Sequence, residues 1–277
     1  MILKKYDDPK EFYDQIGNFL YERELENNLL IGIAENIQHR ENLGDILLCA
    51  VFEKRQPVLV AMMTPPWPLL LNSANVNKES LGFLIEKLQN DDISFSGFLA
   101  EKKIAELFES SWLDAGNTKL KLFRNERIYK LTRCKEINLS TGKIRKAGED
   151  DVGLITNWTI SFQKEIQEET DYDHARKMVI DRLNHIHVWL DAEPVSMCCS
   201  ARETRNSRII NMVYTPPDKR GKGYASSLVH GCCKGILENE KQFCGLFTDL
   251  SNPVSNSIYR KIGFEPVMDL VQYKLER

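Results

Sequence analysis

The sequence predicts an α/β (α+β) protein whose two halves have the same order of elements. Its 277 residues are more than one typical domain, so one large domain and two small ones both fit the length. Hydrophobic residues make up 42% of the chain, which is enough for a packed core and too many for a disordered protein. In each half, stretches with helical spacing alternate with short apolar stretches of strand length.

The first half begins with helical periodicity and ends with alternating polar and apolar residues. Asn77 is expected to cap a helix that carries apolar residues on one face through Leu88. In order, we expect helices at 9–19 and 23–38, strands at 46–53, 58–63 and 69–72, a helix at 77–88, a strand at 95–98, a helix at 101–112, and a hairpin of 119–123 with 127–131.

The same order recurs after a polar, weakly patterned joint at 132–141, so we expect two domains, 1–135 and 136–277. In the second half we expect a strand at 143–146, helices at 149–167 and 173–183, strands at 187–190, 196–203 and 209–214, a helix at 223–238, a strand at 244–249, a helix at 254–262 and a strand at 270–275.

Charge and cysteine content exclude several classes of function. The net charge of −3 argues against a nucleic-acid-coating protein, and no apolar run is long enough to span a membrane. The N-terminus lacks the pattern of a secretory signal. The seven cysteines are odd in number and form no C-x-x-C pair, and the histidines show no metal or triad spacing. We therefore expect a reduced, cytoplasmic protein with no metal, in which the cysteines act as small apolar residues.

A glycine-rich turn in the second half has the composition of an anion-binding loop. The apolar strand at 209–214 leads through Pro216 and Pro217 to Arg220-Gly-Lys-Gly-Tyr-Ala225 and then directly to a helix. Glycines let backbone N–H groups approach a phosphate, and a helix N-terminus adds partial positive charge. Neither the P-loop spacing nor G-x-G-x-x-G is present, because position 226 is serine.

This turn resembles the R/Q-x-x-G-x-G/A signature of the GNAT acetyltransferase family, with Arg220, Gly223 and Ala225 in the fixed positions. A second stretch, 249–267, resembles the family's later motif, in which a strand leads to an asparagine and a helix ends in Tyr-x-x-x-Gly-Phe. Asn252, Tyr259 and Gly263 with Phe264 occupy those positions, and glycine suits a helix C-cap. The resemblance covers about residues 142–277 and implies a mixed, mostly antiparallel twisted sheet flanked by helices.

The resemblance also implies roles for individual residues. Tyr259 matches the tyrosine beside the cofactor sulfur and would be the general acid that protonates the leaving thiolate. The base is expected at Glu165 or Asp249, with Glu168, Glu169 and Asp171 as further candidates. The cosubstrate would be acetyl-coenzyme A (acetyl-CoA), held by Val213, Tyr214, Thr215, Arg220, Gly221, Lys222, Gly223, Tyr224, Ala225, Ser226 and Asn252.

The matching turn of the first half, between Leu71 and the helix at 77–88, contains neither glycine nor arginine. The first half is therefore expected to be a degenerate GNAT-like domain without a cofactor loop. The leading function is an N-acetyltransferase with a small-molecule or protein amine as acceptor, no nucleic-acid or membrane partner, and a homodimer left open. The alternatives are a tandem-domain aminoacyl transferase and a non-catalytic CoA-binding or interaction protein.

Overall fold

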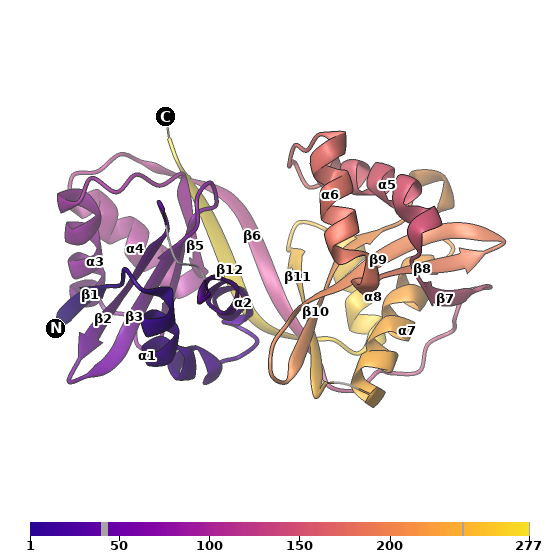
Figure 1. The fold of residues 1–277 in the computed structure, drawn as a ribbon, viewed down its shortest axis with the longest axis horizontal. Coiled ribbons are helices and arrows are strands. Elements are labelled where there is room, and N and C mark those ends of the chain that lie inside the picture. Colours follow the sequence, from indigo (N-terminus) through magenta and orange to yellow (C-terminus); the bar gives the residue numbers. More distant parts are fainter. Residues whose placement is uncertain (40–43, 240, 277) are drawn as a thin grey trace. The chain divides into compact units, whose positions relative to one another are not determined.

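The computed structural model describes residues 1–39, 44–239 and 241–276, and the chain forms two compact units (Figure 1). Unit 1 comprises Met1–Ile128, Asp249–Ser251 and Val267–Arg277, and unit 2 comprises Tyr129–Thr248 and Asn252–Pro266. Unit 1 thus holds most of the predicted domain 1–135, together with two segments from the C-terminal half of the sequence.

Unit 1 is a mixed sheet with helices on both faces. Its strands follow the order β1-β2-β3-β4-β5-β12-β6, and every pair with a described register is antiparallel except the parallel pair β4–β5. The elements are β1 (Ile2–Lys5), α1 (Pro9–Tyr21), α2 (Asn28–Ile37), β2 (Leu47–Glu53), β3 (Gln56–Met63), β4 (Leu69–Ser73), α3 (Lys78–Asn90), β5 (Gly97–Glu101), α4 (Lys102–Asp114), the first part of β6 (Leu120–Leu131) and most of β12 (Glu265–Leu275).

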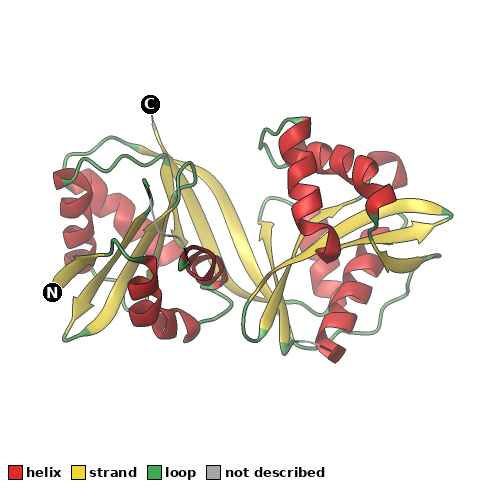
Figure 2. Ribbon diagram, in the orientation of Figure 1, coloured by secondary structure: helices red, strands yellow, loops and turns green. Residues whose placement is uncertain are grey.

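Unit 2 repeats this plan. Its strand order is β7-β8-β9-β10-β11-β6, and the single parallel pair with a described register, β10–β11, is again bridged by a helix. The elements are β7 (Lys143–Lys146), α5 (Val152–Glu165), α6 (Tyr172–Arg182), β8 (Ile186–Asp191), β9 (Glu193–Glu203), β10 (Ser207–Tyr214), α7 (Tyr224–Asn239), β11 (Phe243–Asp249) and α8 (Pro253–Ile262), with short 3₁₀ turns at Glu149–Asp151, Leu183–His185 and Pro217–Lys219. The predicted fold class is confirmed (Figure 2).

Each sheet is buried on both faces, which explains why its central strands are almost wholly apolar. In unit 1, Leu47, Cys49 and Val51 of β2 pack with α3 and α4, whereas Leu48 and Ala50 pack with α1 and α2. In unit 2, α7 and α8 cover one face and α5 covers the other. Among the described residues, no helix has the combination of length and hydropathy that crossing a bilayer requires.

Two details of the first half differ from the sequence prediction. The predicted hairpin of 119–123 with 127–131 is wrong, because β6 is one continuous strand from Leu120 to Leu131. Its partner is the last strand of the chain: Arg127 forms a bidentate ion pair with Asp269 of β12, with distances of 2.6 and 2.8 Å. The short strand β1 was not predicted. The predicted cap is confirmed, since the Asn77 side chain accepts from Ser80 N–H.

The last strand of the chain lies inside the sheet of unit 1, between β5 and β6. Val271 of β12 is 4% exposed and belongs to the core of unit 1, whereas Val267 in the same strand is 40% exposed. We expect Val271→Ala to lower the free energy of unfolding by about 2 kcal/mol, through lost burial and the cavity left behind.

Urea unfolding of the full chain measures this effect. Val267→Ala is the matched control, and a surface position of this kind is expected to change stability by less than about 0.5 kcal/mol. Equal effects of the two substitutions would contradict the placement of Val271 in the core.

Candidate functional site

The candidate site begins at a bulge in β10. The ladder from β10 to β11 joins residues 207–210 to residues 243–246, and it extends no further among the described residues. On its other edge β10 stays paired with β9, with a register shift between Asn211 and Tyr214. Met212 has a φ of 49°, a left-handed conformation that a non-glycine residue adopts at a bulge. The bulge lets β10 diverge from β11 while it remains part of the sheet.

The loop after β10 brings backbone donors to the start of α7. Gly221 and Gly223 have φ values of 81° and 79°, which glycine adopts without steric cost. The first helical bond of α7 runs from Ser227 N–H to the Gly223 carbonyl. The N–H groups of residues 224–226 therefore have no acceptor within the helix. The helix dipole adds partial positive charge at the same end of α7.

A segment far away in the sequence braces this loop. Ser140 Oγ donates to the Lys222 carbonyl at 2.6 Å, and Ser140 N–H donates to Ser227 Oγ at 2.8 Å. A Cβ at Gly223 would lie 2.8 Å from Ser140 Oγ, whereas one at Gly221 would meet nothing within 4 Å. A side chain at position 223 would therefore displace Ser140 Oγ and also strain the backbone at a positive φ. The local sequence pattern of residues 132–141 indicates only a polar joint and gives no sign of this contact.

Two of the cationic residues of the loop, Lys219 and Arg220, pair with acidic residues of the protein. Arg220 Nε donates to the Thr215 carbonyl at 2.8 Å, and its guanidinium pairs with Glu165 at 2.6 Å. Lys219 pairs with Glu193 at 2.7 Å, and Lys222 is exposed. Arg220 therefore fixes the path of the loop after β10, and Glu165, predicted as a base, lies in an ion pair.

Three further predicted residues form local hydrogen bonds. Asn252 caps α8, because its Oδ1 accepts from Ser255 N–H at 3.1 Å. Asp249 belongs to unit 1, and its Oδ1 accepts from Ser251 N–H at 2.7 Å. Asp171 likewise caps α6. Each of these side chains thus has a structural role, whatever its part in binding or chemistry.

Tyr259 is buried on α8 and packs edge-on against Phe264, with ring centroids 5.8 Å apart. Burial raises the pKa of its phenol above the ordinary value, so the hydroxyl stays protonated at neutral pH. Gly263 ends the helix with a φ of 115°, and Phe264 N–H bonds back to the Tyr259 carbonyl. The predicted glycine C-cap is confirmed.

The structure adds polar atoms that the sequence did not single out. Asn211 Oδ1, beside the bulge, is buried without a hydrogen-bond partner among the described residues. The same holds for Thr159 Oγ1 and Gln163 Oε1, which lie one turn apart on α5, the helix that packs against β10. Buried donors and acceptors are usually satisfied, so each of these atoms could accept a hydrogen bond from water or a ligand.

Comparison with known families agrees with this geometry. The family model described as FR47-like protein, a GNAT-type family, matches residues 191–272, which include the bulge, the glycine loop and α8. This match covers less than half of the chain. No curated protein matches the sequence.

Several solved structures have the same fold. A GNAT-family acetyltransferase from Colwellia psychrerythraea matches with a TM-score of 0.64 at 10% identity, covering 100% of both chains. A GCN5-related N-acetyltransferase from Sphaerobacter thermophilus matches with a TM-score of 0.64 at 13% identity, covering 98% of this chain and 94% of its own. A tandem GNAT protein from the clavulanic acid biosynthesis pathway matches with a TM-score of 0.57 at 11% identity over 98% of each chain. The fold is therefore that of GNAT proteins, tandem ones included.

The contact between Ser140 and Gly223 predicts different losses of stability for two glycine substitutions. We expect Gly221→Ala to cost about 1 kcal/mol of stability from backbone strain alone. Gly223→Ala should cost about 1 kcal/mol more, because its Cβ collides with Ser140 Oγ.

Thermal unfolding of single and double variants tests this explanation. In a Ser140→Ala background the two glycine substitutions should become equally costly, because the colliding atom is gone. If Gly223→Ala stays more costly there, Ser140 is not the cause.

Proposed function

We propose that the protein is an N-acetyltransferase that moves an acetyl group from acetyl-CoA to a primary amine, by direct attack in a ternary complex. The observation that carries this proposal is the bulge in β10 followed by the glycine loop and the open N-terminus of α7. The described β10–β11 ladder ends at Ile210, so the β10 backbone beyond it would bind an extended thiol arm, and the loop would supply N–H donors for a pyrophosphate. The GNAT fold and the FR47-like match support the same reaction class.

The residues divide into those that hold the cosubstrate and those that move protons. Backbone groups of Val213 to Thr215 would bind the pantetheine arm, and the N–H groups of residues 221–226 would bind the pyrophosphate. Lys222 is exposed at the loop and adds positive charge there, whereas Arg220 acts by holding the loop. Asn252 would contact the pantetheine arm from the start of α8.

The reaction needs a proton acceptor for the amine and a donor for the departing thiolate. Tyr259 is the proposed donor, because its buried phenol keeps its proton at neutral pH. The proposed base is Glu165 or Asp249. Glu165 would have to leave its ion pair with Arg220 to reach an amine.

Unit 1 supports the proposal that only one copy of the fold binds the cosubstrate. Its strand β4 pairs with β3 without a register shift, and the turn to α3 has no glycine. Asn72 in that strand is buried and donates to Asn27 Oδ1 at 2.5 Å. We propose that this copy forms a dimer face, and that the protein acts in the cytoplasm on a small-molecule or protein amine.

A measurement of acetyl-CoA affinity tests whether the glycine loop at 220–226 binds the cosubstrate. Gly223→Glu should weaken binding at least about a hundredfold, because its side chain fills the loop and places negative charge beside the phosphates. Isothermal titration of the full chain measures the affinity.

The matched control is Gly116→Glu, which adds the same charge at an exposed left-handed glycine of unit 1 and should leave affinity unchanged. Absence of acetyl-CoA binding by the wild-type chain would overturn the proposed function. Binding without turnover across an amine panel would favour a CoA-binding protein, and aminoacyl transfer from transfer RNA would favour the tandem-domain transferase.

Tyr259→Phe separates chemistry from binding. Loss of the phenolic proton donor is expected to lower kcat about a hundredfold or more and to leave the affinity for acetyl-CoA similar. The readout is thiol release during turnover, followed over a range of pH. Tyr6→Phe, which removes a buried phenol from unit 1, is the control and should behave as wild type. Unchanged turnover in Tyr259→Phe would remove the role assigned to that residue.

A further inference from the structure

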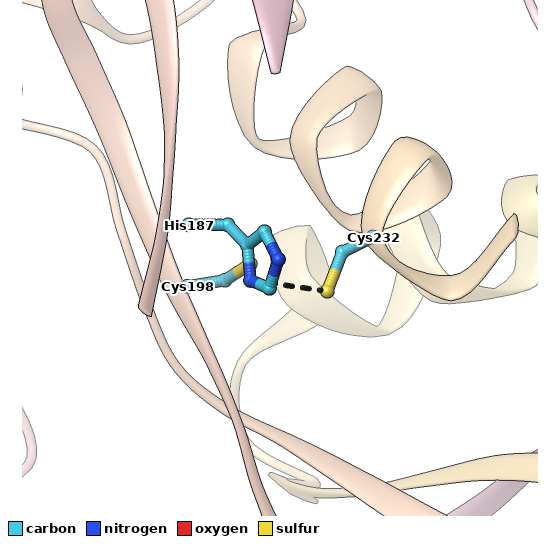
Figure 3. A group of neighbouring side chains, drawn as sticks. All are labelled: His187, Cys198 and Cys232. Carbon is cyan, nitrogen blue, oxygen red and sulfur yellow. Dashed lines mark hydrogen bonds between the residues drawn. The ribbon is translucent and has the colours of Figure 1, made fainter. Parts of the chain in front are cut away.

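Three side chains with metal-binding atoms meet on one face of unit 2. His187 of β8 and Cys198 of β9 are direct partners across the antiparallel pair, so their side chains share a face of the sheet. Helix α7 packs over this face and brings Cys232 Sγ to 3.7 Å from His187 Nδ1. The three ligand atoms all lie within 4.8 Å of one another. Figure 3 shows the His187 ring facing the Cys232 sulfur, with Cys198 beside the ring.

The surroundings of these atoms differ from those of an ordinary apolar cysteine. Cys198 is fully buried, Cys232 is 4% exposed and His187 is half-buried. The Cys232 thiol thus faces an imidazole ring and a second thiol, both within 4.8 Å of its sulfur. A thiolate beside an imidazole is the form in which cysteine binds a metal ion.

We propose that His187, Cys198 and Cys232 form a binding site for one thiophilic d¹⁰ cation, with Zn²⁺ as the probe. Two thiolates and one imidazole form a donor set that zinc prefers, and three protein ligands leave one coordination position open. Around tetrahedral zinc, ligand atoms lie about 3.4–3.8 Å apart, as follows from bond lengths of about 2.0–2.3 Å. The 3.7 Å distance between His187 and Cys232 already fits, and the other pairs, within 4.8 Å, need to close by at most about 1.4 Å.

Binding would release the thiol protons that remain on the two cysteines, and the charge of Zn²⁺ would balance two thiolates. The site is separate from the phosphate loop, because Cys232 lies eight residues beyond Tyr224, or about 12 Å along the axis of α7. The ion would tie α7 to β8 and β9, the elements that hold the loop's helix against the sheet. It stabilises the folded state, and this inference stands whether or not the chain acetylates amines.

The adjacent cysteines of each pair supply matched controls. Cys199 faces the opposite side of β9, in the core formed with α5, and Cys233 lies beside Cys232 on α7 outside the cluster. The experiment adds Co²⁺ or Zn²⁺ to the reduced full-length chain and records thiolate-to-cobalt absorption, bound zinc per chain after dialysis, and the thermal midpoint.

We expect one zinc per chain, a tetrahedral cobalt–thiolate spectrum, and a zinc-dependent rise in the midpoint. Cys198→Ala and Cys232→Ala should lose the spectrum and weaken zinc binding at least about a hundredfold, whereas Cys199→Ala and Cys233→Ala should keep both. His187→Gln, at a half-buried position, provides a second test if a cysteine variant fails to fold, and should also lose the spectrum.

Absence of the cobalt–thiolate spectrum in the reduced wild-type chain would overturn the site. Equal loss in the adjacent-cysteine controls would overturn the assignment to these three residues. A Cys198–Cys232 disulfide that forms under air while the reduced protein takes up no metal would also overturn it.

Discussion

The candidate site depends on one constraint: β10 must leave its parallel partner β11 after Ile210 while it stays bonded to β9. A bulge at Met212 achieves this, at the cost of a left-handed residue that the sheet on the β9 side holds in place. The direction of β10 after the bulge sets the path of the loop and the position at which α7 begins. Arg220 anchors the loop to the Thr215 carbonyl, the glycines turn it, and α7 begins with its N–H groups free of helical acceptors.

The two units share the same order of helices and strands. They differ at the strand that leaves its parallel partner, because β10 has a bulge and the described pairing of β4 with β3 has none. In unit 1, β4 also has a parallel partner and leads to a helix, but its pairing with β3 is regular and no left-handed glycine follows it. The units are also joined through the chain itself, since β6 and β12 each contribute residues to both. The strand that follows α8 therefore completes the sheet of unit 1, and Asp269 and Val271 serve that unit although they follow the site residues in sequence.

Helix α7 combines two chemically different environments. Its first turn presents backbone donors beside an exposed, basic loop, whereas its middle carries cysteines into the core of unit 2. Cys198 and Cys232 face a histidine, whereas Cys49, Cys199, Cys233 and Cys244 are buried in the cores and Cys134 is partly exposed. The reading of cysteine as a small apolar residue suits Cys49 and Cys199, which burial keeps in the thiol form by raising their pKa. It does not describe the cluster around His187.

Most helices and strands, the GNAT-like second half, the glycine turn and the C-cap at Gly263 could be predicted from the sequence. They depend on local periodicity and on residues that lie close together in the chain. Local pattern misplaced the hairpin in β6, since its partner strand lies about 140 residues later. Three contacts are visible in the tertiary structure alone. Ser140 Oγ lies against Gly223, and Glu165 pairs with Arg220. His187 lies beside Cys198 and Cys232. Strand register and helix packing bring these residues together, and neither leaves a fixed spacing in the sequence.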